Sequence, residues 1–329
     1  MRQFPRAIAL AVSWLAATAM AVMAHAQISA ATLTQANQDL QAGEVDKALA
    51  LLTPLPQTGQ GADQAQNLIC RVQITLAVWS QAVTSCQAAT RLTPNSSDFH
   101  MWLARALGGK AGAASFLTAY SLAKQTLSEF QEAVKLGPAN VGALSDLGDF
   151  YRQAPGIVGG GTDKATAIAT QLAKVSPARA DQLNGNIAAT KKDYATAEND
   201  LKQAIAADPH PAEAWVNLAQ FYAAQKRWTD LDNAINSSVS VAAHDQQSGV
   251  ALYDGAGLLI STNRNPTLAA QMLENYLASS SKTEEGPAFI AYIRLGNLKQ
   301  KLGDAAGAQA ALATAAAMAH EYNQAQASH

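Results

Sequence analysis

The most constraining feature of this sequence is a short pattern of large and small apolar residues that follows Pro209. Trp215, Leu218, Ala219 and Tyr222 stand in the order W-x2-L-small-x2-Y. Residues spaced three and four apart lie on one face of an α-helix, so the pattern predicts a helix with an apolar face. These side chains are therefore interpreted as residues of a packed core and not as residues of a site.

The same pattern recurs along almost the whole chain. Leu144, Leu147 and Gly148 repeat it in one segment, and Leu295 and Gly296 repeat it near the end. Each segment has the 3.6-residue apolar period of a packed helix, and no run of alternating apolar and β-branched residues suggests a sheet. Prolines recur where several segments end, at Pro94, Pro138, Pro177 and Pro209. The chain is therefore expected to consist of repeated helical hairpins.

These residues resemble the tetratricopeptide (TPR) repeat, in which small residues stand near positions 8, 20 and 27 of about 34 and Pro is common near position 32. The resemblance covers nearly all of residues 29–322. It implies an all-α fold, a right-handed TPR superhelix (α-α solenoid) of about eight helical hairpins. Another type of helical-hairpin solenoid is the alternative. The stretch from His100 to Ala173 also resembles an exported bacterial TPR subfamily with an A-P-G-x-V-G-G-G loop.

Residues 1–26 have the features of a secretory signal peptide. Arg2 and Arg6 precede an uncharged, mostly apolar run over residues 7–23, and the A-H-A sequence at 24–26 has small residues where a signal peptidase cuts. An uncleaved membrane anchor is the alternative, but the run is short for a spanning helix of about 20 residues. The sequence therefore predicts a cleaved signal peptide and an exported protein, periplasmic or secreted.

The remaining residues, 27–329, are expected to form a single TPR solenoid domain, because no linker rich in Pro, Ser or charge divides them. The full chain has 23 Lys and Arg against 25 Asp and Glu, and without Arg2 and Arg6 the balance is 21 against 25, or −4. A mildly acidic chain does not suit phosphate binding, so we expect no nucleic-acid partner. No later stretch is long and apolar enough for stable membrane insertion.

Cys70 and Cys86 are the only cysteines. In the TPR register they lie on the two antiparallel helices of one unit, and export would place them in an oxidising compartment. A disulfide between them would close a loop of about 15 residues, which is worth on the order of 3 kcal/mol. Two buried thiols are the alternative. The spacing is not C-x-x-C, so redox catalysis is not expected.

Two segments interrupt the repeat. About ten extra residues are expected between the helices of the third unit, around 108–122, and about five in the glycine-rich loop of the fourth unit, around 155–163. Both segments are candidates to project from the same edge of adjacent units. A ligand-binding or enzymatic protein that uses these two loops is therefore an alternative to a bare repeat protein.

The sequence contains no pattern typical of catalysis or metal binding. Histidines outside the signal segment fall in different units and form no H-E-x-x-H or Cys/His set. The glycines at 159–161 lack the G-x-x-x-x-G-K-[ST] pattern of a phosphate loop, and no G-x-S-x-G motif is present. Asp146, Asp149 and Asp163 would suit a calcium site only weakly, and a solvated acidic edge is the simpler interpretation. The expectation is a protein with no cofactor, no metal and no catalytic residue.

The resemblance implies a concave groove lined by the first helix of each unit. Arg71, Arg105 and Arg152 would form a cationic stripe there, suited to an acidic peptide or a carboxylate terminus. Solvated polar side chains without a binding role are the alternative. The full set of candidate partner-binding residues is Asn67, Arg71, Met101, Arg105, Asp149, Arg152, Gln182, Asn186 and Gln220.

The predicted function is non-catalytic binding of a protein or peptide partner in this groove, by an adaptor or assembly factor of the periplasm or envelope. A third hypothesis is a structural scaffold that self-associates through the Ala-rich final helix, expected over Asp304–Gln326. The sequence identifies neither the partner nor the oligomeric state.

Overall fold

The structure is a computed structural model that describes residues 27–320 and 322. In this part of the chain it contains sixteen α-helices, one short 3-10 helix and no strand, so the predicted all-α solenoid is confirmed. Consecutive helices pair as eight hairpins. The first four are α1 (Ala30–Gln41) with α2 (Val45–Leu52), α3 (Ala62–Thr75) with α4 (Trp79–Leu92), α5 (Ser97–Gly112) with α6 (Phe116–Leu136), and α7 (Val141–Gln153) with α8 (Thr162–Leu172). The last four are α9 (Pro177–Thr190) with α10 (Tyr194–Ala207), α11 (Ala212–Ala224) with α12 (Trp228–Ala242), α13 (Gly249–Ser261) with α14 (Pro266–Ala278), and α15 (Ala288–Lys301) with α16 (Ala305–Met318).

The residues of the opening motif pack in the core, as the spacing predicts. Leu218, Ala219 and Tyr222 on α11 are buried in one apolar cluster with Leu231 of α12, and Trp215 packs against the same cluster. The small residue of the pattern is needed because two helices touch there. In the fourth hairpin, for example, Gly148 of α7 stands at the position of Ala219. A Cβ added to Gly148 would lie 3.3 Å from the Ile168 side chain of the facing helix α8. The register inferred from the motif therefore describes how the hairpins pack.

Most hairpins share one type of turn. The first helix ends in a residue with positive φ, and the next backbone N–H donates to a carbonyl five residues back, which satisfies an otherwise orphaned group at the helix end. In the fifth hairpin, Asp193 N donates to Ala188 O at 2.9 Å and Lys192 has a φ of 63°. The six turn residues of this type are Gly43, Ala77, Lys192, Lys226, Asn263 and Gly303. The third and fourth hairpins do not use this turn, and these are the two units in which the repeat is interrupted.

The third unit differs from the sequence-based prediction. The extra residues expected between its helices lengthen the helices instead, since α5 runs to Gly112 and α6, which has 21 residues, begins at Phe116. Only residues 113–115 separate the two helices. The segment is rich in Ala and Leu, which favour helix, and it has no proline to stop either helix. In the fourth unit the glycine-rich loop is present, with a 3-10 helix η1 (Gly156–Val158) before α8.

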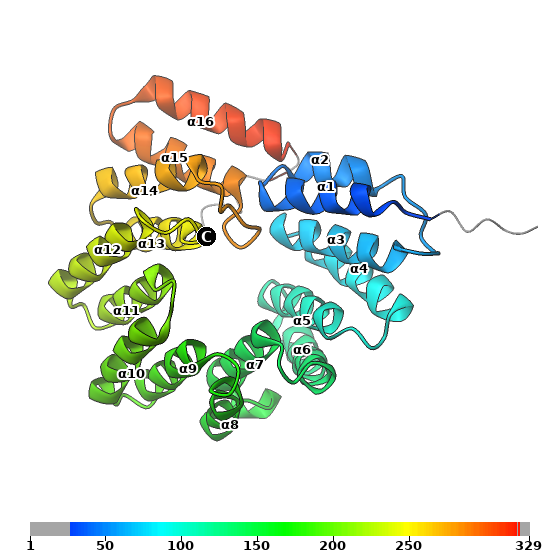
Figure 1. Ribbon diagram of the computed structural model, residues 1–329, viewed down its shortest axis with the longest axis horizontal. Coiled ribbons are helices and arrows are strands. Elements are labelled where there is room, and N and C mark those ends of the chain that lie inside the picture. Colours follow the sequence, from blue (N-terminus) through cyan, green and yellow to red (C-terminus); the bar gives the residue numbers. More distant parts are fainter. Residues whose placement is uncertain (1–26, 321, 323–329) are drawn as a thin grey trace, which may run out of the picture.

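The hairpins are arranged as a closed ring. Figure 1 shows the odd-numbered helices facing the centre and the even-numbered helices on the periphery, with α1 and α2 lying beside α15 and α16. One buried apolar cluster joins the two ends of the chain, and it contains Leu40 and Val45 from the first hairpin with Phe289 and Ile293 from the last. We call this contact between the first and last hairpins the seam. The sequence did not predict it.

Ring closure explains how the terminal hairpins are stabilised. A terminal unit of an open solenoid exposes an apolar face unless its outer surface is polar. Here the first and last hairpins cover one another, and Phe289 is 0% exposed. The fit is close, because a Cβ at Gly43 would lie 2.7 Å from the backbone nitrogen of Ala288. The first and last hairpins therefore act as caps of one another.

A disulfide joins Cys70 on α3 to Cys86 on α4, with 5.2 Å between the Cα atoms. Both residues are fully buried. Of the two states that the sequence left open, the structure has the bridged one. It fixes α3 to its partner helix next to Arg71, which is a residue of the inner face.

Three sequence-based predictions concern the ends of the chain. The signal peptide at residues 1–26 lies outside the described residues, so its cleavage stays a prediction. The final helix, α16, spans Ala305–Met318, with Asp304 as its N-cap. It is therefore shorter than the predicted Asp304–Gln326. Within the described residues, no helix combines the length and the apolar character needed to cross a membrane.

Candidate functional site

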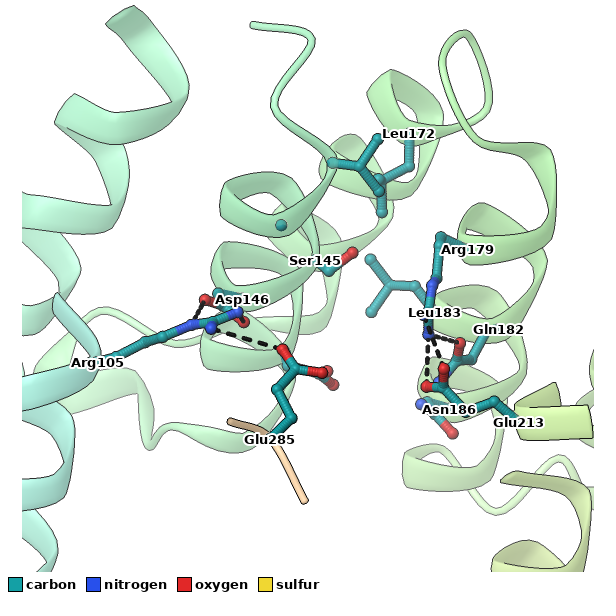
Figure 2. Close-up of a pocket in the computed structure, with 13 residues that line it drawn as sticks. Arg105, Ser145, Asp146, Leu172, Arg179, Gln182, Leu183, Asn186, Glu213 and Glu285 are labelled. Carbon is teal, nitrogen blue, oxygen red and sulfur yellow. Dashed lines mark hydrogen bonds and ion pairs between the residues drawn. The ribbon is translucent and has the colours of Figure 1, made fainter. Parts of the chain in front are cut away.

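The inner face of the ring carries a polar cavity of about 400 Å³ between α5, α7, α9 and α11. We call it the central cavity. Figure 2 shows Arg105 and Asp146 on one side, Arg179 and Glu213 on the other, and Glu285 between them. Glu285 comes from the loop between α14 and α15. The thirteen residues that line the cavity are Arg105, Val141, Gly142, Ser145, Asp146, Asp149, Leu172, Arg179, Gln182, Leu183, Asn186, Glu213 and Glu285.

Arg105 forms the first charged group of the central cavity. Its Nε donates to Asp146 Oδ2 at 2.6 Å, and its guanidinium lies over the Trp102 ring at 4.5 Å. Glu285 Oε1 is 3.7 Å from Nη1 of the same arginine. Burial opposes the charge of Arg105, but Asp146, Glu285 and Glu284 together outweigh it, so the pKa of Arg105 lies above its ordinary value. The side chain is therefore a fixed cation in a defined orientation.

Arg179 forms the second charged group, on the opposite wall. Its Nη1 and Nη2 donate to the two carboxylate oxygens of Glu213 at 2.9 and 3.0 Å, which is a bidentate pair. Nη1 also donates to Gln182 Oε1 at 3.0 Å. These bonds tie α9 to α11, so the two arginines are held by different units on either side of the cavity.

Asp254 is a further acidic group near Glu213 and Glu285. The pKa of Asp254, on α13, is raised to about 6 by burial and by repulsion from Glu213 and Glu285, and the opposing effect of Arg294 is smaller. Like charges in a poorly solvated site disfavour ionisation in this way. Asp254 therefore ionises less readily than an ordinary aspartate.

A second cavity, of about 480 Å³, lies on the inner face of the first three hairpins. We call it the N-terminal cavity. Asn67 of α3 lies in its wall, is only 5% exposed, and its Nδ2 has no hydrogen-bond partner. Arg71, one turn further along, donates to Glu284 and to Asn37 Oδ1. The eleven lining residues are Ala30, Leu33, Thr34, Asn37, Gln64, Asn67, Leu68, Arg71, Asp98, Phe99 and Trp102.

A third cavity, of about 440 Å³, lies between α5, α6 and α7 and has a larger apolar share. It brings Gly108 and Ala111 of the long third hairpin near Phe150 and Ala154 at the end of α7. Residues 155–163 do not line it, and Ile157 in that loop is 71% exposed. The two interrupted units therefore share a cavity, but the wall comes from helices and not from the predicted loops.

The structure distributes the nine candidate groove residues over several environments. The central cavity collects Arg105, Asp149, Gln182 and Asn186, and the N-terminal cavity collects Asn67 and Arg71. Three more lie elsewhere: Met101 is buried in an apolar cluster, Arg152 pairs with Asp149 at 2.8 Å, and Gln220 is exposed on α11. Their role in binding stays a prediction.

The arginines of the predicted cationic stripe are neutralised by acids of the same chain. Arg71 pairs with Glu284, Arg105 with Asp146 and Arg152 with Asp149. The inner face is therefore a surface of alternating charges and not a cationic stripe.

Sequence reasoning missed two central residues of this surface. Arg179 stands three residues before the candidate Gln182 on the same helix, so a stricter use of the repeat register could have found it. Glu285 gave no such signal, because it belongs to the loop between α14 and α15 and not to a first helix of the repeat.

The described residues offer no arrangement typical of a metal site. No three or more His, Cys, Asp and Glu side chains in this part of the chain are grouped so that they could hold an ion. Asp146 and Asp149, weighed above for calcium, face arginines instead. Asp163 lies in the first turn of α8.

Comparison with known proteins identifies the repeat. Residues 188–230 match the family model of the tetratricopeptide repeat. They extend from the end of α9 to the start of α12 and include the motif at Trp215. A search of curated proteins finds no match. The crystal structure of a thermophilic TPR protein in Thermus thermophilus is similar, with a TM-score of 0.49 and 19% identity over 58% of this chain and 97% of that chain.

Proposed function

This chain is a tetratricopeptide repeat protein, and we propose that it binds an extended segment of a protein partner along its inner face, without catalysing a reaction. Repeats of this kind serve mainly as surfaces for other proteins. We also propose that the protein is an adaptor or assembly factor of the bacterial periplasm or envelope, and that the signal peptide at residues 1–26 directs its export to that compartment.

The observation that carries the proposal is the side-chain amide of Asn67. A buried donor without a partner costs roughly 1–3 kcal/mol, so a structure seldom retains one without a reason. This amide lies in the wall of a cavity on the inner face, beside the fixed guanidinium of Arg71. A peptide carbonyl that accepts from Nδ2 would remove the cost. Extended peptide backbone offers such acceptors at regular intervals.

The closed ring restricts the kind of partner. The first and last hairpins meet at the seam, so the inner face has no lateral opening between α1 and α15. The polar groups of the inner face are spread over successive helices. They are better matched to a narrow extended segment than to the flat surface of a folded domain.

Three asparagine variants test the proposal as a matched set. Asn67→Ala and Asn186→Ala remove amides from the two cavities, whereas Asn199→Ala removes an exposed amide from α10 on the periphery. The immobilised mature protein is used to capture partners from an envelope extract, and the amount of each retained protein is compared. We expect the inner-face variants to retain about fivefold less of the true partner, since a hydrogen bond contributes about 1 kcal/mol. Equal retention by all three variants would reject the inner face as the binding surface.

The location is tested separately. Cell fractionation of the native host with N-terminal sequencing of the isolated protein should give Gln27 as the first residue in the periplasmic fraction. A chain that keeps Met1 in the cytoplasm would contradict the envelope assignment and would leave the binding test unaffected.

A second candidate function is binding of a small molecule in the cavity between α5, α6 and α7. Its partly apolar wall, with Phe130 and Phe150, favours this alternative over an enzymatic role for the loops. A thermal-shift screen against metabolites distinguishes the two functions, because a ligand at 100 times its Kd adds about 2.7 kcal/mol of stability.

A further inference from the structure

The loop between α14 and α15, residues 279–287, is unlike the other connections between hairpins. It leaves α14 on the periphery and reaches α1, α3 and α5 on the inner face, where Glu284 and Glu285 meet arginines of the second and third hairpins. Figure 1 shows this loop projecting toward the centre of the ring. We call residues 279–287 the strap.

Polar contacts hold the strap in place. Glu284 N donates to Gln41 Oε1 at 3.2 Å, and Thr283 N donates to the Tyr276 hydroxyl at 3.2 Å. The Tyr276 hydroxyl in turn donates to the carbonyl of Gly286. The Glu284 carboxylate also pairs with Arg71, with Oε1 2.5 Å from Nη2. No residue from 279 to 285 is fully buried, whereas Gly286 and Pro287 at the end of the strap are buried next to Ala288.

The contrast with the seam is sharp. Immediately after the strap, Ala288 and Phe289 are 1% and 0% exposed and belong to the apolar cluster that closes the ring. Segments with few buried apolar contacts open at a small fraction of the free energy needed to unfold a packed helix. Residues 279–285 of the strap can therefore detach while the seam stays closed.

The tip of the strap is under opposing electrostatic forces. Glu285 is attracted by Arg105 at 3.7 Å and by Arg179, and it is repelled by Asp254. Its side chain remains 62% exposed and forms one wall of the central cavity. In Figure 2 the Glu285 side chain lies between the two arginines of the cavity. Displacing this segment would widen the cavity and free the guanidinium of Arg105 on one side.

We propose that the strap is a gate: residues 279–285 open and close over the central cavity while the ring stays shut, and Glu284 on Arg71 holds the gate closed. The purpose of the gate rests on the proposed function, since an extended segment must pass the strap to contact both arginines. The opening itself is a property of the free protein and is measured without a partner.

Hydrogen exchange of the wild-type protein is the first test. We expect the amides of Thr283 and Glu284 to exchange at least about 100-fold faster than amides in the interior of α15, with little dependence on denaturant, because their exchange needs only local opening. If strap and α15 amides exchange with the same opening free energy, the strap moves only on global unfolding and the gate does not exist.

Thiol labelling is the second test, and it reports on the cavity directly. The native cysteines are joined to each other, so Ser145→Cys, on α7 in the cavity wall, introduces a single free thiol. Its rate of reaction with a bulky maleimide is measured with and without Glu284→Gln. We expect Glu284→Gln to raise the rate by about threefold to tenfold, since it weakens the contact that holds the strap.

Matched controls make the labelling result specific. Glu274→Gln removes a carboxylate on α14 that pairs with Lys299 away from the cavity, and it should leave the rate unchanged. Ser80→Cys on the exposed side of α4 reports any general change in reagent access. Equal rates in the Glu284→Gln and Glu274→Gln backgrounds would overturn the gate. If Glu284→Gln fails to fold, the exchange measurement on the wild-type protein decides. Neither readout depends on a partner, so failure of the gate and failure of the binding proposal are distinguishable.

Discussion

Arg71 and Glu284 lie 213 positions apart in the sequence, yet their side chains form a short polar link between the second hairpin and the loop that precedes the last one. The two side chains are 17% and 10% exposed, so water screens the pair only weakly. Arg71 also contacts Asn37 and lies over the Trp102 ring. The pair connects the strap with the inner face of the first three hairpins.

Removal of one partner of this pair should destabilise the protein. Arg71→Met leaves the Glu284 carboxylate without its cation, and we expect the free energy of unfolding to fall by about 2–3 kcal/mol. The loss is below that of a rigidly buried pair, because the strap can open and let Glu284 reach water. Urea titration measures it. A double variant, Arg71→Met with Glu284→Leu, should recover part of the loss, and a strictly additive double variant would show that the two groups are not coupled.

The fit at the seam is tested by two glycines with the same backbone conformation. Gly43 and Gly303 have φ of 79° and 86° at equivalent turns, but a Cβ at Gly43 would meet Ala288, and a Cβ at Gly303 meets nothing within 4 Å. Gly303→Ala should therefore cost only the roughly 1 kcal/mol of an unfavourable φ. Gly43→Ala should cost about 1–3 kcal/mol more, as expected for overpacking.

Thermal or urea unfolding measures the difference in the free energy of unfolding between Gly43→Ala and Gly303→Ala. Increased hydrogen exchange at the start of α15 in Gly43→Ala alone would locate the effect at the seam. Equal destabilisation by the two substitutions would mean that the contact with Ala288 adjusts without cost.

Loss of the disulfide should weaken the N-terminal part of the ring. Replacement of both Cys70 and Cys86 by Ala removes a cross-link between residues 16 positions apart, and we expect about 3 kcal/mol less stability from the chain-entropy model. Chemical denaturation of the oxidised protein and of the double variant measures it. Mass spectrometry after alkylation without reductant should find no labelled thiol in the native protein, and two labelled thiols would contradict the bridge.

The raised pKa of Asp254 predicts an unusual pH dependence of the free energy of unfolding. Its folded-state pKa is about 6, above the ordinary 3.8, so the folded state binds a proton more tightly than the unfolded state does. Stability from this group is therefore greatest below about pH 4, falls as the pH rises from about 4 to 6, and is constant above that range. Asp254→Asn should remove this fall and stabilise the protein at neutral pH by about 3 kcal/mol.

Urea denaturation of the wild-type protein and of Asp254→Asn at about pH 4.5 and 7.5 tests this prediction. The difference between the two proteins should be larger at the higher pH. A difference that is the same at both values would mean that Asp254 titrates normally in the folded state.

Local sequence information was enough to define the hairpins. Leu218, Ala219 and Tyr222 lie within about one turn of each other, so their spacing alone places them on one face of a helix. The small side chain in this face lets the second helix of the hairpin approach. The same local information placed Asn67 and Arg71 on a first helix, and therefore on the inner face. It also brought Cys70 near Cys86 without deciding whether they are bridged, since the two helices of one hairpin are close along the chain.

Closure of the solenoid was not predictable in this way. It depends on small rotations between successive hairpins, and these add up over the whole chain before Phe289 can meet Leu40. No local spacing encodes that sum. The partners of the inner-face arginines follow from it, because Glu284 and Glu285 reach Arg71 and Arg105 only after the ring has brought the last hairpin beside the first. Local periodicity thus determined which side chains face the centre, and the accumulated geometry of the ring determined what they meet there.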